Sequence, residues 1–137
     1  MIGTDGDQAA LRIEFPAAAD ELPAVRSRLR GWLAGAVADQ GRAYDLLLAA
    51  GEACTNSVEH GHRGDRGPVR LVAELRRGEV RITVTDSGRW IPRARIRESK
   101  ATQLRGRGLA LMRELTTHTR LTILDSGTTV ELCAPAA

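Results

Sequence analysis

The chain has 137 residues, of which 42% are hydrophobic and 27% are charged, a balance typical of one folded domain. Its net charge of +3 does not indicate nucleic-acid binding, and an aromatic content of 3% leaves few rings to stack on bases. No apolar run approaches the length that crosses a membrane. The two cysteines, Cys54 and Cys133, form no CxxC pair and indicate neither a disulfide framework nor a zinc site. We therefore expect a cytoplasmic protein without nucleic-acid or membrane partners.

The first half of the chain predicts one strand and two helices after a flexible segment, residues 1–10. Alternating apolar and charged residues predict a strand over Leu11–Phe15. Asp20 is a candidate N-cap for the first helix, which places Pro23 in its first turn and continues to about Asp39. A second amphipathic helix is expected from about Arg42 to His60.

The second half predicts two hairpins with a helix between them. In chain order the segments are strands Val69–Leu75 and Val80–Val84, joined by a turn at Arg77-Gly78, an irregular arginine-rich stretch Ser87–Arg105, a helix Gly106–Leu115, and strands Leu121–Ile123 and Val130–Leu132. The order of strands and helices predicts an α/β two-layer sandwich over residues 11–134. We expect the helices on one face of a mixed, largely antiparallel sheet.

Two polar residues of the second helix are candidates for chemistry. Glu52 and Asn56 are four residues apart and therefore share a helix face. An amide oxygen can bind a Mg²⁺ that also holds phosphate, and a carboxylate one turn away can accept a proton from a hydroxyl. A solvated polar face on an amphipathic helix would show the same spacing, so the pair alone leaves both interpretations open.

Two glycine-containing segments are further candidates. Asp86 ends a strand, where it can accept a hydrogen bond from an adenine amine, and Gly88 would let a ring approach the backbone. Gly106 and Gly108 lie where the sequence predicts a helix start, whose backbone amides favour phosphate. An ordinary turn and a solvated loop are the alternatives for these segments.

The order of these motifs resembles the GHKL ATPase superfamily, and most closely the bacterial anti-sigma-factor serine kinases. The segments that carry the likeness are Gly51–Gly61, Asp86–Gly88, Gly106–Met112 and Gly127–Val130. The similarity extends from about Leu11 to Ala134. It implies a Bergerat-type fold that binds ATP and Mg²⁺ beneath a mobile lid.

The resemblance also implies roles for individual residues. Glu52 corresponds to the catalytic base and Asn56 to the Mg²⁺ ligand. Asp86 matches the acid that recognises adenine, and Thr129 matches the threonine that assists it. The remaining nucleotide contacts implied by motif matching are His60, Gly88, Gly106, Arg107, Gly108 and Leu109. Trp90 departs from the pattern, because many members have a second glycine there, and this bears on lid closure more than on adenine binding.

The activity implied by the resemblance is that of an anti-sigma factor and serine/threonine protein kinase. Such a protein sequesters a sigma factor, phosphorylates a serine of a STAS-type anti-anti-sigma antagonist, and acts as a homodimer. The alternative is an ATP-binding regulatory module without phosphotransfer. Three arginines of the first helix, Arg26, Arg28 and Arg30, lie off its apolar stripe and are candidates for the sigma contact, or simply keep the helix soluble.

Overall fold

The computed structural model describes residues 8–61, 67–87, 100–124 and 127–137. For residues 60, 61 and 100–107 it describes the backbone only. The elements in chain order are β1 (Leu11–Pro16), the 3₁₀ turn η1 (Ala19–Glu21), α1 (Leu22–Ala36), α2 (Gln40–Asn56), the π-helical segment η2 (Ser57–Gly61), β2 (Pro68–Arg76), β3 (Glu79–Asp86), α3 (Lys100–Leu115), β4 (His118–Leu124) and β5 (Gly127–Pro135). This order matches the predicted succession of strands and helices.

The strands form one sheet in the order β1-β2-β3-β5-β4, and every neighbouring pair is antiparallel. A mixed sheet was expected, but the described strands contain no parallel pair. The reason is the place of β5. The crossover through α3 leaves β3 and β4 running in the same direction, and β5 then lies between them, antiparallel to both.

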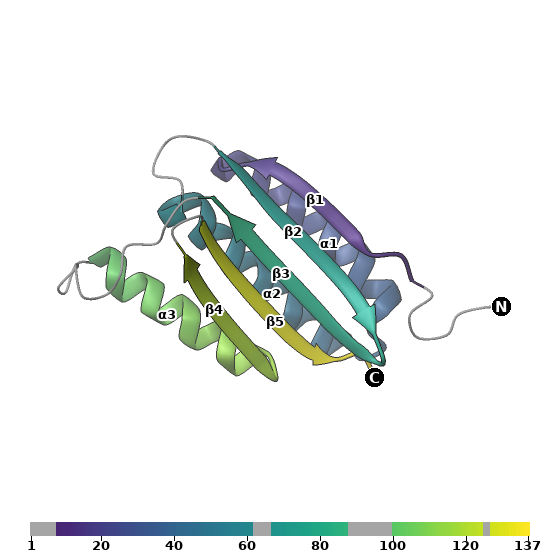
Figure 1. The fold of residues 1–137 in the computed structure, drawn as a ribbon. Coiled ribbons are helices and arrows are strands. Elements are labelled where there is room, and N and C mark those ends of the chain that lie inside the picture. The colour runs from purple at the N-terminus through teal and green to yellow at the C-terminus, as the bar shows by residue number, and fades with distance from the viewer. Residues whose placement is uncertain (1–7, 62–66, 88–99, 125–126) are drawn as a thin grey trace.

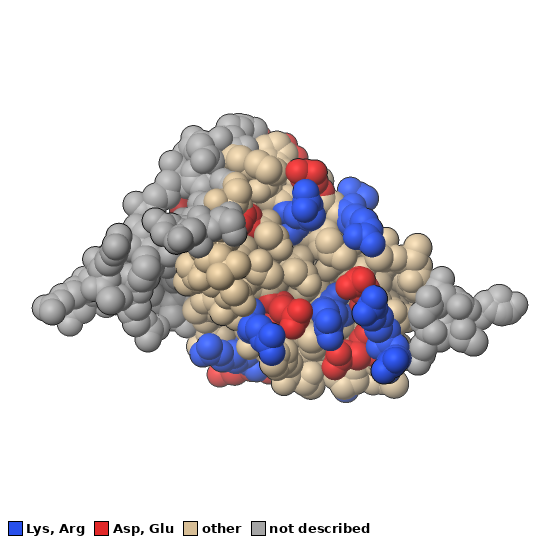
Figure 2. All heavy atoms as spheres, viewed as in Figure 1, with Lys and Arg blue, Asp and Glu red and all other residues tan. Residues whose placement is uncertain are grey.

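The helices cover one face of this sheet, which confirms the predicted two-layer architecture (Figure 1). Side chains that alternate toward the helices are buried, whereas those on the other face are mostly charged or hydroxylated. Figure 2 shows arginine and acidic side chains scattered over that open face. The core is aliphatic, and its largest fully buried members are Leu29, Leu33, Leu46, Leu71, Ile82, Met112 and Leu132.

The ends of the first two helices differ from the prediction. Asp20 lies within η1 and is not the N-cap of α1; Glu21 stands at that position, and its side chain makes no capping bond. The helix ends at Ala36 because Val37 is extended, with φ −119° and ψ 123°. Asp39 instead caps α2, where its carboxylate accepts a hydrogen bond of 2.9 Å from the Arg42 amide. That bond lowers the pKa of Asp39.

The third helix begins six residues earlier than predicted, at Lys100. Gly106 and Gly108 therefore lie inside α3, and the argument that placed phosphate at a helix start there is wrong for this conformation. A glycine inside a helix costs only about 1 kcal/mol. Good helix formers at neighbouring positions, such as Ala101 and Leu104, offset that cost.

Two further local features involve Trp32 and the turn between β2 and β3. Gln8 and Ala9, within the segment predicted to be flexible, both bond to Trp32 of α1. Gln8 Nε2 donates to the Trp32 carbonyl at 2.8 Å, and Trp32 Nε1 donates to the Ala9 carbonyl at 2.8 Å. The predicted turn between β2 and β3 is present, with positive φ at Arg77 (53°) and Gly78 (76°). Within the described residues, no helix is both long and apolar enough to span a bilayer.

Candidate nucleotide-binding site

The polar end of α2 and a glycine of α3 meet at one point. Asn56 ends α2 and is buried, with 3% of its surface exposed, while Glu52 one turn earlier is half-buried. A Cβ atom placed on Gly108 would lie 2.9 Å from Glu52 Oε2 and 3.2 Å from Asn56 Nδ2. The bare glycine is what allows α3 to lie against both polar groups.

The chemistry of this point fits a phosphate-bound Mg²⁺. Asn56 Nδ2 is buried and has no hydrogen-bond partner among the described residues. A rotation of the amide exchanges its nitrogen and oxygen, so the side chain can offer either a donor or a ligand here. Mg²⁺ takes few ligands from protein and the rest from phosphate and water. In the described part of the chain no three His, Cys, Asp or Glu side chains gather into an all-protein metal site.

Asp86 lies at the end of β3 on the helix-facing side of the sheet, with 3% of its surface exposed. Its register partners are Val69 on β2 and Thr128 on β5. Thr128 is 1% exposed, so an acid and a hydroxyl are buried directly opposite each other. The arrangement can hold a ligand that offers both a donor and an acceptor, such as the edge of a purine.

Thr129, the threonine that the motif match selected, lies on the opposite face of the sheet. Its register partners are Thr85 on β3 and Thr122 on β4, which face away from the helices. Successive strand residues point to opposite faces, so a shift of one residue moves the side chain to the other side. Thr128 has the same parity as Val130 and Leu132, which are both buried, and that alternation of apolar residues is the signal that would have found it.

The other predicted contacts are placed only in part. His60 lies in η2, the segment that directly follows α2, and Gly106 and Arg107 lie within α3. For these three residues the structure describes only the backbone. Leu109 is half-buried and packs against the hydrophobic core. Gly88 and Trp90 are outside the described residues.

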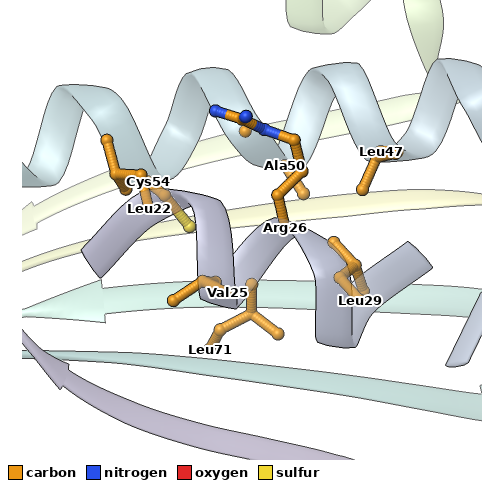
Figure 3. Close-up of a pocket in the computed structure, with 9 residues that line it drawn as sticks. Leu22, Val25, Arg26, Leu29, Leu47, Ala50, Cys54 and Leu71 are labelled. Atoms are coloured by element: carbon orange, nitrogen blue, oxygen red, sulfur yellow. The ribbon is translucent and has the colours of Figure 1, made fainter. Parts of the chain in front are cut away.

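Cys54 lies on the core side of α2 and takes no part in this site. Figure 3 shows it among apolar side chains of α1 and the sheet, including Leu22, Val25 and Leu71. Burial raises the pKa of Cys54 to about 12, against a smaller lowering effect of Arg26. The space beside it measures about 10 Å³, at most enough for one water molecule. Its thiol is therefore a packing group with no reactive role at neutral pH.

Comparison with known proteins identifies a family for the chain. Residues 15–134 match the model of the histidine kinase-like ATPase domain. The serine-protein kinase RsbW of Bacillus thuringiensis (strain Al Hakam) is 32% identical over 82 residues, 57% of this chain and 49% of that protein. RsbW of Bacillus cereus (strain AH820) gives the same figures. The chain thus spans about half the length of these relatives.

Solved structures lead to the same family. The RsbU and RsbW domains of Rv1364c from Mycobacterium tuberculosis superpose with a TM-score of 0.74 and 31% identity, covering 93% of this chain and 32% of that one. A structure of the SiaB-SiaC complex from Pseudomonas aeruginosa shares the fold at 14% identity and a TM-score of 0.67, covering 92% of this chain and 90% of that chain. The chain therefore belongs to the family of histidine kinase-like ATPase domains, and it is similar to serine-protein kinases of the RsbW type.

Proposed function

We propose that this chain binds ATP with Mg²⁺ and transfers the γ-phosphoryl group to a serine of a partner protein. The observation that best supports this is the convergence of Glu52 and Asn56 on Gly108, with a buried amide nitrogen that has no partner among the described residues. A solvated polar helix face, the alternative for these two residues, would leave Asn56 exposed, and it is buried.

The proposed chemistry assigns one role to each group. Glu52 takes the proton of the serine hydroxyl as the serine oxygen bonds to the γ-phosphorus. The bond from that phosphorus to the β,γ-bridging oxygen breaks, and ADP leaves with the electron pair. Asn56 would hold a Mg²⁺ ion, and that ion would neutralise phosphate charge when bound. Asp86 and Thr128 hold the adenine edge at the other side of the site.

Phosphotransfer needs Glu52 as a base, whereas nucleotide binding alone does not. We expect Glu52→Gln to keep ATP affinity and to lower phosphotransfer by roughly 100-fold or more, since the amide preserves shape but accepts no proton. The measurement is labelled-phosphate transfer to candidate antagonist proteins of the same genome, alongside calorimetry with ATP. Asp45→Asn is the matched control, because it makes the same change two turns earlier on α2. Equal transfer rates for Glu52→Gln and the parent would show that Glu52 is not the base, whereas no transfer by the parent itself would leave the binding-module alternative.

The protein partners of this chain are proposed from its similarity to RsbW. An RsbW-type protein is expected to hold a sigma factor in one state and to phosphorylate its antagonist in another, and we propose both for this chain, as a homodimer. α1 supports the sigma contact, since Arg26, Arg28 and Arg30 are all exposed and that helix contains no acidic residue. Light scattering of the purified chain across a range of concentrations tests the dimer.

A further inference from the structure

A groove lies between the second half of α1 and the first half of α2, where the two helices meet at their short connection. Its volume is about 510 Å³. The residues that line it are Arg30, Leu33 and Ala34 from α1, Val37 and Ala38 from the connection, and Gln40, Ala43, Tyr44 and Leu47 from α2. Most of these side chains are apolar, and neither Glu52 nor Asn56 is among them.

This groove is separate from the nucleotide site. Tyr44 precedes Asn56 by twelve residues on the same helix, which at 1.5 Å per residue corresponds to roughly 18 Å along its axis. A ligand in the groove therefore does not touch the groups proposed to handle ATP. Binding of a ligand in the groove can therefore be measured independently of kinase activity.

The charge at the rim of the groove is positive. Arg30 is exposed, and it makes no ion pair with any residue in the described ranges. The lining residues from α2 are uncharged, and the acidic residues of that helix, Asp45 and Glu52, do not line the groove. An occupant with a carboxylate at its edge would meet an unpaired guanidinium, a geometry in which arginine is favoured.

The apolar surface continues beyond the groove. Tyr44 is 60% exposed and Leu48, one turn later on α2, is 40% exposed although it lies outside the lining. A small molecule enclosed in the groove would leave Leu48 in water. An amphipathic helix laid along the seam would cover both side chains, and tyrosine and arginine are the residues that most often anchor such contacts.

We infer that this groove docks an acidic amphipathic helix from a partner protein. Apolar side chains of that helix fill the space between Leu33 and Leu47, and a carboxylate of that helix pairs with Arg30. The inference does not depend on phosphotransfer, because the groove holds none of the residues assigned to it.

The chain offers a built-in reporter for this contact. Tyr44 is its single tyrosine, so 3-fluorotyrosine labelling gives one ¹⁹F signal at the rim of the groove. The probe is a synthetic helical peptide with leucines at i, i+4 and i+7 and glutamates on the flanking positions; a second peptide has lysine in place of each glutamate. We expect the acidic peptide to shift the signal in a saturable way and the lysine peptide to bind at least roughly fivefold more weakly.

Three variants locate the contact. Arg30→Glu should weaken the acidic peptide roughly fivefold or more, because attraction becomes repulsion. Ala34→Phe fills the groove from an exposed position and should also weaken it, while leaving thermal unfolding near the parental temperature. Arg28→Glu is the matched control: it makes the same charge change on the same helix, but outside the groove lining, and should have a smaller effect.

Several results would overturn the inference. Equal shifts with both peptides, or equal losses in Arg28→Glu and Arg30→Glu, would remove the specific role of the rim charge. A signal that moves with protein concentration alone would assign the groove to a second copy of the chain. Saturable binding of decanoate with no binding of the acidic peptide would assign it to a small anionic amphiphile. ATP affinity measured on the same samples shows whether the nucleotide site is intact in each case.

Discussion

Asp86 and Thr128 are opposed on neighbouring strands and are both buried. We propose that they contact the edge of the adenine base. We expect Asp86→Ala to remove nearly all ATP and ADP binding. Thr128→Val should weaken binding by up to about tenfold, the usual worth of one hydrogen bond, whereas Thr129→Val should change little. Calorimetry with ADP measures all three. A larger loss in Thr129→Val than in Thr128→Val would restore the assignment made from the motif.

At this scale the sequence predicts which residues share a helix face, but not which of two adjacent strand residues faces the site. Glu52 and Asn56 could be paired from their spacing alone, because a helix places residues four apart on one face. Two adjacent threonines in a strand cannot be separated by a motif match, since only the register with β3 shows which one faces Asp86. The contact between Gly108 and Glu52 joins two helices distant in the chain, and no local pattern reports it.

At the scale of elements, the start of β5 is tightly constrained by the end of β3. Gly127 has φ +151°, and a Cβ atom placed on it would lie 2.0 Å from the Asp86 carbonyl oxygen. We expect Gly127→Ala to lower the free energy of unfolding by on the order of 1–3 kcal/mol, because the backbone of one strand must move. Urea denaturation measures the change.

The control for that substitution is Gly31→Ala on α1. A Cβ atom there would meet nothing within 4 Å, and alanine is the better helix former, so stability should stay level or rise by up to about 1 kcal/mol. A Gly127→Ala variant as stable as the parent would show that the approach of β5 to Asp86 is looser than the structure indicates.

The bounds of β2 and β3 were predicted more closely than the helix ends or the bounds of β4 and β5, for a physical reason. Alternation over Val69–Leu75 and Val80–Val84 reflects one buried sheet face, and it located β2 and β3 to within a residue or two. Helix ends depend on where the backbone leaves helical angles. Asp20 and Asp39 are both acceptable caps in sequence, and only the backbone shows that Asp39 serves as one.

At the scale of the whole molecule, the helical layer carries one candidate site at each end of α2. The candidate nucleotide site lies where α2 ends, and the groove near Tyr44 lies where α2 begins. The layer itself could be predicted from the order of elements and the amphipathic patterns. The groove could not, because it depends on how closely the side chains of α1 and α2 fill their shared seam.

The last prediction concerns the partner that α1 is proposed to hold. Arg26 and Arg30 are one turn apart and both line spaces along the seam with α2, whereas Arg28 lines neither space. Figure 3 shows Arg26 extending from α1 toward α2 beside Ala50. We therefore expect the double variant Arg26→Glu, Arg30→Glu to weaken sigma-factor binding by on the order of 2 kcal/mol or more, if carboxylates of the sigma factor are desolvated there.

ATP affinity should not change in that double variant, because both arginines lie outside the nucleotide site, and Arg28→Glu alone should reduce sigma binding less. A pull-down with quantified affinity against the candidate sigma factors of the same genome makes the measurement. Retention of the sigma factor at parental affinity would move the contact to the arginine-rich residues 89–107. Loss in the double variant but not in Arg30→Glu alone would place the sigma contact at Arg26. The groove beside Tyr44 would then be left to a different acidic partner, because Arg30 would be free to pair while the sigma factor is bound.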